Sequence, residues 1–173
     1  DASNGTVNIT ITNNTIIAGT GGNNQGNLGI SVTTANAGVI NYTIENNRVG
    51  TDGVTNQPLL NTGINVFAGG TTCIASGTIK NNTVRLLGAG SSGFGISIFS
   101  SGSAAPGLTT IIATVTGNTV SNVGLDYGIR CEASGTAAAS ILKLRLSGNN
   151  VSVLPGALDA IRVTSRLTST VCA

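Results

Sequence analysis

Apolar and polar residues alternate in short runs along much of the chain. Val7, Ile9 and Ile11 are separated by polar residues. The same alternation returns at 40–44, 111–115 and 142–146. A period of two residues is typical of β-strands with one buried face. No stretch is long enough and periodic enough for an amphipathic helix, and Gly, Asn and Ser fill the connections. The pattern therefore predicts an all-β protein.

Two short sequence motifs, which we call the first and the second word, recur at a nearly constant spacing. The first is apolar-x-x-Asn-x-apolar. Its asparagines, 33, 35, 36 and 31 residues apart, are Asn14, Asn47, Asn82, Asn118 and Asn149. The second word is small-Ile-x-apolar. Its isoleucines, 34, 32, 33 and 32 residues apart, are Ile30, Ile64, Ile96, Ile129 and Ile161. A shared period of about 33 residues predicts one repeat domain over residues 1–173, a parallel β-solenoid of about five coils.

The asparagine of the first word has a physical reason to recur. Equivalent residues of successive coils stack about 4.8 Å apart, so aliphatic columns form the core. The alternation breaks between Ile11 and Asn14, so we expect the chain to turn a corner there. An Asn at this corner tolerates left-handed backbone, and its amide can bond the local backbone and the Asn of the next coil. We therefore predict a stacked asparagine ladder.

The two words together resemble those of a known family. The combined motif is T-I-x-N-N-T-V followed by G-I-x-V, and its repeats cover nearly the whole chain. They are similar to the repeats of the pectate-lyase-like superfamily, especially its secreted bacterial repeat regions. The resemblance implies a right-handed parallel β-helix, in line with the right-handed crossovers between parallel strands. It also implies an extracellular or cell-surface location. The resemblance does not give a function, because this fold carries lyases, hydrolases, tailspikes, adhesins and structural proteins.

Composition argues against catalysis. Charged residues make up 8% of the chain, the formal charge is +2 and there is no His to act as a base near neutral pH. Asp126 and Asp159 form the best carboxylate pair, because they hold roughly equivalent positions on adjacent coils with Arg130 and Arg162 nearby. We interpret them as an exposed surface pairing of little energetic weight. No catalytic, cofactor or metal site is predicted.

Nucleic acid and membrane are not expected partners. The basic residues of the last third are spread out, whereas a nucleic-acid footprint needs a cluster. Apolar runs are far shorter than the roughly 20 residues of a membrane span. The chain opens without a signal peptide pattern.

The three cysteines lack the spacing of a zinc site. Cys131 falls in an inward column and should be a buried, inert thiol. Cys73 and Cys172 fall at similar places around the coil, and we regard them as candidate disulfide or intersubunit thiols. A bridge within one chain would have to span about three coils, which is too far.

The ends of the repeat carry the main functional hypothesis. The strand pattern starts close to Asp1, a sixth coil opens before Ala173, and no amphipathic cap is evident. Uncapped ends would bind another copy, so we expect a head-to-tail homopolymer in an extracellular filament or a surface or matrix assembly. A fragment of a longer β-helical surface protein would look the same. The expected self-association residues are Val7, Ile9, Ile11, Ile161, Val163 and Val171.

Two alternatives stay open. One is a carbohydrate-binding or carbohydrate-active module, adhesin-like or tailspike-like, with polysaccharide as partner; Phe67, Phe94 and Phe99 could form its apolar patch or pack under loops, while Tyr42 falls inward. The other is an ice-binding protein. Its outward threonine column, closed by an arginine, is Thr10, Thr43, Thr78, Thr114 and Arg145. Glu45 and Lys80 interrupt the neighbouring column.

Overall fold

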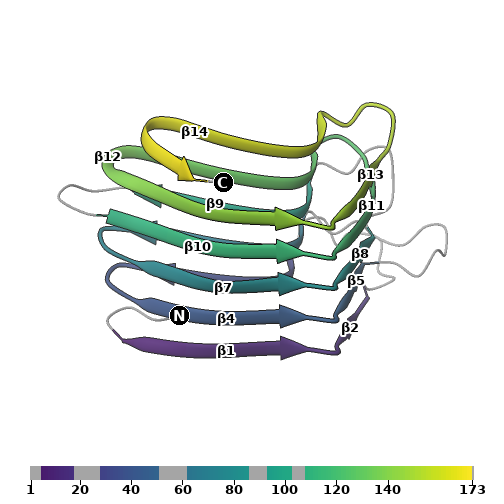
Figure 1. Cartoon of the computed structure of the whole chain (residues 1–173), viewed down its shortest axis with the longest axis horizontal. Helices are drawn as coiled ribbons and strands as arrows, with labels where there is room; N and C mark the ends of the chain where they lie inside the picture. Colours follow the sequence, from purple (N-terminus) through teal and green to yellow (C-terminus); the bar gives the residue numbers. More distant parts are fainter. Residues whose placement is uncertain (1–4, 18–27, 51–61, 86–92, 103–107, 173) are drawn as a thin grey trace.

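The structure is a computed structural model that describes residues 5–17, 28–50, 62–85, 93–102 and 108–172, with the backbone alone at 136–138 and 167–170. Every strand pairing within these ranges is parallel, and no helix occurs in them. The strands wind into a β-solenoid of about four turns with about 33 residues each (Figure 1). The predicted all-β solenoid is confirmed.

Each turn passes through three faces, which we name after their first strands. The β1 face holds β1 (Thr6–Thr12), β4 (Val39–Glu45), β7 (Ile74–Lys80) and β10 (Leu108–Thr116). The β2 sheet holds β2 (Thr15–Ile16), β5 (Arg48–Gly50), β8 (Thr83–Arg85), β11 (Thr119–Val123) and β13 (Asn150–Val153). The β3 face holds β3 (Leu28–Ala35), β6 (Thr62–Gly70) and β9 (Phe94–Gly102).

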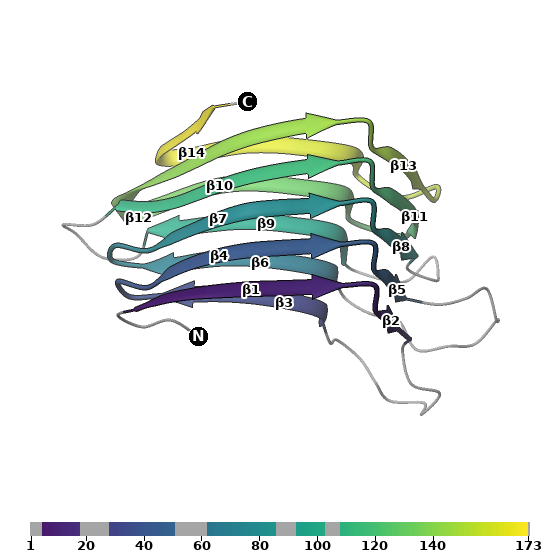
Figure 2. The same ribbon diagram turned by 60° about the horizontal axis from the view of Figure 1, so that its bottom comes forward.

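Two long strands turn the corner between the β3 face and the β1 face (Figure 2). In β12 (Tyr127–Ser147), residues 129–135 pair with β9 on the β3 face and residues 139–147 pair with β10 on the β1 face. The strand β14 (Asp159–Cys172) follows β12 around the same corner. These two strands join the two faces into one nine-stranded hydrogen-bonded sheet. They also form the layers at the C-terminal end of the solenoid.

The register of the strands confirms the predicted columns. On the β1 face the stacked residues are Ile11, Ile44, Ile79, Val115 and Leu146. In the β2 sheet they are Ile16, Val49, Val84, Val120 and Val151. On the β3 face they are Ile30, Ile64, Ile96, Ile129 and Ile161. The middle members of each column are fully buried and together form a continuous core.

The small residue of the second word has a steric cause. A Cβ atom added at Gly63 would overlap the Cγ1 atom of Val84 and would lie 2.7 Å from the carbonyl oxygen of Gly95. Gly29, Gly95 and Gly128 show the same two overlaps with the layer above them. The β3 face and the β2 sheet therefore approach too closely for a methyl group between layers. The fifth residue of this column, in the uppermost layer, is Ala160.

The backbone at the corner differs from the prediction in one respect. Left-handed backbone occurs at the residue before each ladder asparagine and not at the ladder asparagine itself. These residues, with φ between 53° and 66°, are Asn13, Asn46, Asn81, Gly117 and Gly148. The residue before each ladder asparagine adopts the left-handed conformation because the ladder side chain has to point inward to stack. Asn and Gly adopt this conformation at the least cost.

Candidate functional site

The asparagine ladder runs through the interior of the corner between the β1 face and the β2 sheet. The backbone N–H and the Nδ2 of Asn82 both donate to Oδ1 of Asn118, at 2.9 and 3.0 Å. The same Nδ2 donates to the carbonyl of Ile44 at 2.9 Å. The Oδ1 of Asn82 accepts from the N–H and Nδ2 of Asn47, at 2.9 and 3.0 Å. The amide of Asn82, 1% exposed, is therefore fully hydrogen-bonded, and the predicted ladder is confirmed.

The ladder has a direction. Each asparagine from Asn14 to Asn118 donates its backbone N–H and its Nδ2 to the Oδ1 of the ladder asparagine in the next layer toward the C-terminus. In the first layer Asn14 is exposed, and its Oδ1 accepts no hydrogen bond from the described residues. In the last layer the backbone N–H of Asn149 finds no ladder acceptor among them. One end of the solenoid thus presents an acceptor and the other end presents donors.

Apolar residues are exposed on the uppermost layer of the β3 face. Ile161 and Val163 of β14 are 42% and 39% exposed, whereas their partners Ile129 and Cys131 in the layer below are both 0% exposed. Together with the open donors of Asn149, these side chains make the C-terminal layer a surface that resembles the inside of the solenoid.

The opposite end carries the first three residues of the predicted self-association set. Val7, Ile9 and Ile11 lie on β1 and are partly buried against the core. The last predicted residue, Val171, lies on the β1 face, where it pairs with Leu142. The structure therefore places the predicted residues on the two end layers, with Val171 on a different face from Ile161 and Val163.

An arginine–aromatic cluster covers the outside of the β3 face. The guanidinium carbon of Arg130 lies 4.8 Å from the ring centroids of both Phe94 and Phe99. The Nη2 of Arg130 contacts Oε2 of Glu132 at 2.7 Å, and Nε of Arg166 contacts Oε1 at 3.1 Å. Glu132 is 3% exposed although it points outward, because these groups surround it. Cation–π contacts and charge-assisted hydrogen bonds stabilise the cluster.

The aromatic rings of this face stack along the solenoid axis. Phe67 stacks on Phe99 with centroids 5.6 Å apart, and Phe94 stacks on Tyr127 at 5.9 Å. Arg162 lies 5.0 Å above the ring of Tyr127 and donates to its Oη at 2.9 Å. Sequence reasoning left these phenylalanines either as an apolar patch or as packing under loops, and it missed the arginines between them. The available signal was Arg130 and Glu132 on the outward positions of the same strand.

The predicted carboxylate pair is out of register by one residue. Asp159 pairs with Tyr127, and the carbonyl of Asp126 accepts from the N–H of Leu158 at 3.1 Å. Asp159 contacts Arg162 at 3.7 Å, so its charge has a partner on its own strand. Asp126 lies three residues before Ile129, whereas Asp159 lies two residues before its partner Ile161, so the two carboxylates are not opposite each other.

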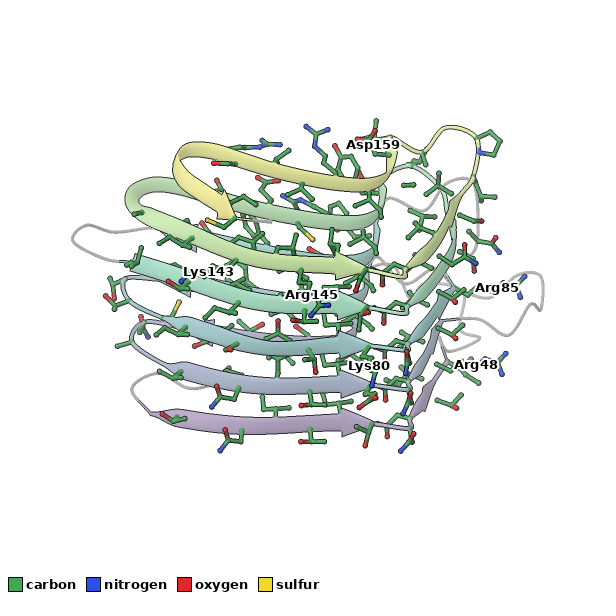
Figure 3. The ribbon with its side chains drawn as sticks, in the orientation of Figure 1. Arg48, Lys80, Arg85, Lys143, Arg145 and Asp159 are labelled. Atoms are coloured by element: carbon green, nitrogen blue, oxygen red, sulfur yellow. The ribbon has the colours of Figure 1, made fainter. Side chains whose placement is uncertain are left out.

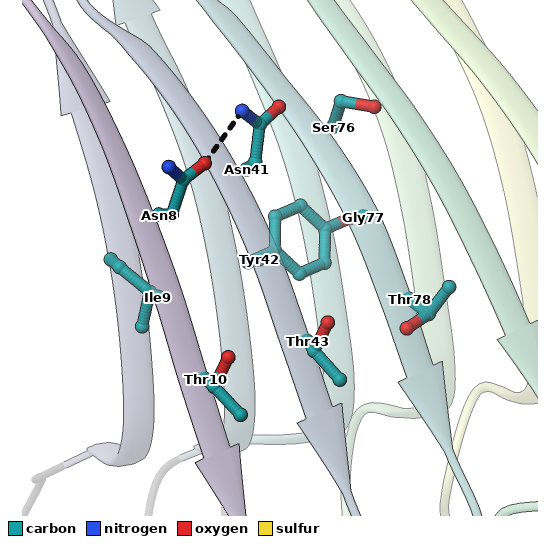
Figure 4. A pocket seen from close by; sticks show the side chains of 9 residues that line it. All are labelled: Asn8, Ile9, Thr10, Asn41, Tyr42, Thr43, Ser76, Gly77 and Thr78. Atoms are coloured by element: carbon teal, nitrogen blue, oxygen red, sulfur yellow. Dashed lines mark hydrogen bonds between the residues drawn. The ribbon is translucent and has the colours of Figure 1, made fainter.

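A polar trough crosses the outer surface of the β1 face (Figure 4). One wall carries Asn8, Asn41 and Ser76, and the Nδ2 of Asn41 donates to Oδ1 of Asn8 at 2.9 Å. The facing wall carries the hydroxyls of three threonines in successive layers: Thr10, Thr43 and Thr78. The floor is formed by Ile9, Tyr42 and Gly77, and the volume is about 370 Å³. The trough offers amide and hydroxyl groups at the strand repeat distance.

The two rows continue beyond the trough toward the C-terminal end of the β1 face. The Asn8 row passes through the exposed Ile112 to Lys143. The threonine row passes through Thr114 to Arg145, and both cations lie on the outside of this face (Figure 3). In the neighbouring column Nζ of Lys80 contacts Oε1 of Glu45 at 3.2 Å. The interruption of the threonine array is therefore an ion pair. The ice-binding alternative stays a prediction that a thermal hysteresis measurement would test.

The three cysteines are free thiols. Cys131 is buried, which raises the pKa of its thiol to about 12. Cys73 is 0% exposed; burial raises the pKa of its thiol, and the hydrogen bond with Thr109 opposes that shift. Cys172 is exposed and pairs with Lys143, whereas Cys73 precedes β7 at a different place in the coil. Of the two candidate intersubunit thiols, only Cys172 is at the surface.

Inside the core, Tyr42 extends over Gly77, where a Cβ atom would lie 2.6 Å from the Tyr42 ring. Its hydroxyl is buried and finds no hydrogen-bond partner among the residues that the structure describes. Burial, together with the neighbouring Cys131, raises the pKa of Tyr42 well above its ordinary value. Gly77 therefore makes the space that allows an aromatic ring inside the solenoid.

Within the described ranges, no three Cys, Asp or Glu side chains come close enough to hold a metal ion. The described part of the chain contains no helix that is long and apolar enough to cross a membrane. The chain matches no protein-family model, no curated protein and no solved structure.

Proposed function

We propose that this protein is an extracellular structural solenoid that builds a filament, or a surface or matrix assembly, by stacking its end layers. The observation that carries the proposal is the complementarity of the two ends. The first layer offers the Oδ1 of Asn14, and the last layer offers the N–H of Asn149. A second copy stacked in the internal register would bring Asn14 over Asn149 and Ile30 over Ile161.

This junction would be weaker than a step inside the solenoid. In the column of small residues that precede the stacked isoleucines, the four lower layers carry glycine, which leaves room for the valine of the next layer. The uppermost layer carries Ala160 at this position. In the stacked register the methyl group of Ala160 would face Ile16 of the incoming copy. The two layers would have to separate slightly, which loses packing contacts. We therefore expect assembly that depends strongly on concentration.

Side-chain chemistry supports a structural and non-catalytic role. Glu45, Glu132 and Asp159 each contact a basic residue, which leaves them paired and not directed into a cleft. The outer aromatic rings are stacked on one another. The weakly charged composition rich in Asn, Thr and Gly, and the resemblance to secreted pectate-lyase-like β-helix repeats, support the extracellular location and the superfamily.

Electron microscopy with light scattering tests the proposal. We expect thin filaments whose axial repeat is about 24 Å, the height of five layers at the strand spacing. Assembly should disappear in the Ile161→Asp variant, because a charge would enter the apolar contact. The control is Thr114→Asp, which adds the same charge on the outer surface of a middle layer. Monomers of the unmodified protein at all concentrations would contradict the proposal.

The trough on the β1 face favours a second candidate function, carbohydrate binding. Its walls offer amide and hydroxyl groups in a regular row, and Lys143 and Arg145 add positive charge two layers beyond the trough in the same rows. A chain of sugars with an acidic group near one end would match this arrangement. The test is titration with neutral and uronic-acid oligosaccharides while chemical shifts of Asn8, Asn41 and Thr43 are followed. No shift with either ligand would contradict it.

A further inference from the structure

The last segment of β14 already occupies part of the edge where a second copy would add. Its residues 169–172 pair with residues 140–143 of β12 on the β1 face. Val171 pairs with Leu142, a fully buried residue, and packs against the core. Cys172 pairs with Lys143, and both are exposed. The remaining residues of β12, from Leu144 to Ser147, have no β14 partner on their outer edge.

The register shows which residues of an incoming copy compete with this segment. Thr6 pairs with Val39, and the same row continues through Ile74 and Thr110 to Ile141. The row of Asn8 ends in the same way at Lys143. Ile141 and Lys143 are the partners of Thr170 and Cys172. The first half of an incoming β1 would therefore need the positions that residues 170–172 hold.

We propose that residues 169–172 are a competing strand that gates end-to-end stacking. The inference rests on the proposed function, because it concerns the same end layer. While the segment is docked, an incoming copy can pair only Ile9–Thr12 of its β1 with Leu144–Ser147. Release of the segment opens the full strand edge and the apolar surface of Leu142. Detachment of the segment thus limits the rate of assembly.

A single substitution should release the segment. Val171→Asp places a charge against the apolar core, so the segment should detach while the layers below remain folded. We expect filament elongation, followed by light scattering under reducing conditions, to accelerate at least fivefold, about the factor that corresponds to one net hydrogen bond. Cys172→Asp adds the same charge one residue later, on the exposed side opposite the cation of Lys143, and should not accelerate elongation. A chain truncated after Thr168 should reproduce the effect of Val171→Asp.

A disulfide should have the opposite effect. Residues 143 and 172 are direct partners on adjacent parallel strands, a separation of about 4.8 Å that a disulfide can bridge. In the Lys143→Cys variant, oxidation should therefore fix the segment to β12 and stop elongation. Reduction of the same sample should restore elongation, so each preparation is its own control.

The outcomes separate the gate from the stacking itself. Faster elongation of both released variants and a redox-dependent block in Lys143→Cys would support the gate. If the unmodified protein forms filaments but the released variants elongate no faster than the unmodified protein, the gate is wrong and stacking stands. If neither the unmodified protein nor any released variant assembles, while thermal melting shows that each is folded, both proposals are wrong.

Discussion

The uppermost layer and the layer directly below it carry the same sequence words in different surroundings. Ile129 and Ile161 are the same residue in paired positions, yet they are 0% and 42% exposed. Asn118 is fully hydrogen-bonded in its layer, whereas Asn149 has no ladder partner above it in the described part of the chain. The comparison shows that the repeated motif determines the position of a residue within its layer. Neighbouring layers supply most of its burial, as expected for a fold with nearest-neighbour contacts.

Truncation of the paired isoleucines should give the largest difference. Ile129→Ala leaves a cavity in a closed core, so we expect it to lower the free energy of unfolding by about 4 kcal/mol. Ile161→Ala removes a half-exposed side chain and should cost less than about 1 kcal/mol. Urea unfolding of dilute, monomeric protein measures both. Equal losses would mean that the uppermost layer is covered.

The ladder should show the same contrast on a slightly smaller scale. Asn82→Ala would leave the Asn47 amide donors and the Ile44 carbonyl without their buried partner, at a cost of about 3 kcal/mol. Asn149→Ala affects a ladder step with one open side and should cost about 1 kcal/mol. The two variants can be compared by thermal melting. A larger loss at Asn149 would reverse the expected order.

The glycine column allows a reciprocal exchange. Gly95→Ala should lower the free energy of unfolding by about 2 kcal/mol, because its Cβ would meet Val120 and the carbonyl of Gly128. Ala160→Gly should leave the stability of the monomer within about 0.5 kcal/mol, since Ala160 is exposed. If end layers stack, Ala160→Gly should also lower the concentration at which filaments form. Sedimentation after overnight incubation measures that concentration.

The smallest effect concerns alkaline pH. Burial raises the pKa of Cys131 from 9.0 to about 12, so the unfolded chain loses this proton first. The contribution of the buried, neutral Cys131 thiol to the free energy of unfolding is constant below about pH 9. This contribution is lost as the pH rises toward 12. Cys131→Val introduces a β-branched residue like its partners Val163 above and Ile98 below, and should reduce the loss by about 1 kcal/mol per pH unit. Parallel pH titrations of stability for the two proteins would reveal the difference.

Sequence reasoning reached the fold because every layer repeats the same steric requirements. The asparagine ladder and the three apolar columns follow from residue type and spacing alone. The left-handed residue was placed one position too late, because the sequence shows two adjacent asparagines at three corners and does not say which one points inward. The offset of Asp126 and Asp159 was already present in the sequence, since they lie three and two residues before the stacked Ile129 and Ile161.

The outer surface was harder to predict than the core. Phe94, Phe99, Arg130 and Glu132 come from two neighbouring turns, and their contacts depend on how long side chains bend across strands. Such contacts have no fixed spacing along the chain. The gate formed by residues 169–172 was missed for a related reason: it became visible only once the register of β14 on β12 was known.

The uniform direction of the ladder has an electrical consequence. Five side-chain amides point the same way, so their dipoles add along the axis of the solenoid, as peptide dipoles do in a helix. The layer at Asn149 therefore carries a partial positive charge and the layer at Asn14 a partial negative charge. Any rod made by extending this ladder would have two chemically different tips, and the exposed N–H groups at one tip would attract anions.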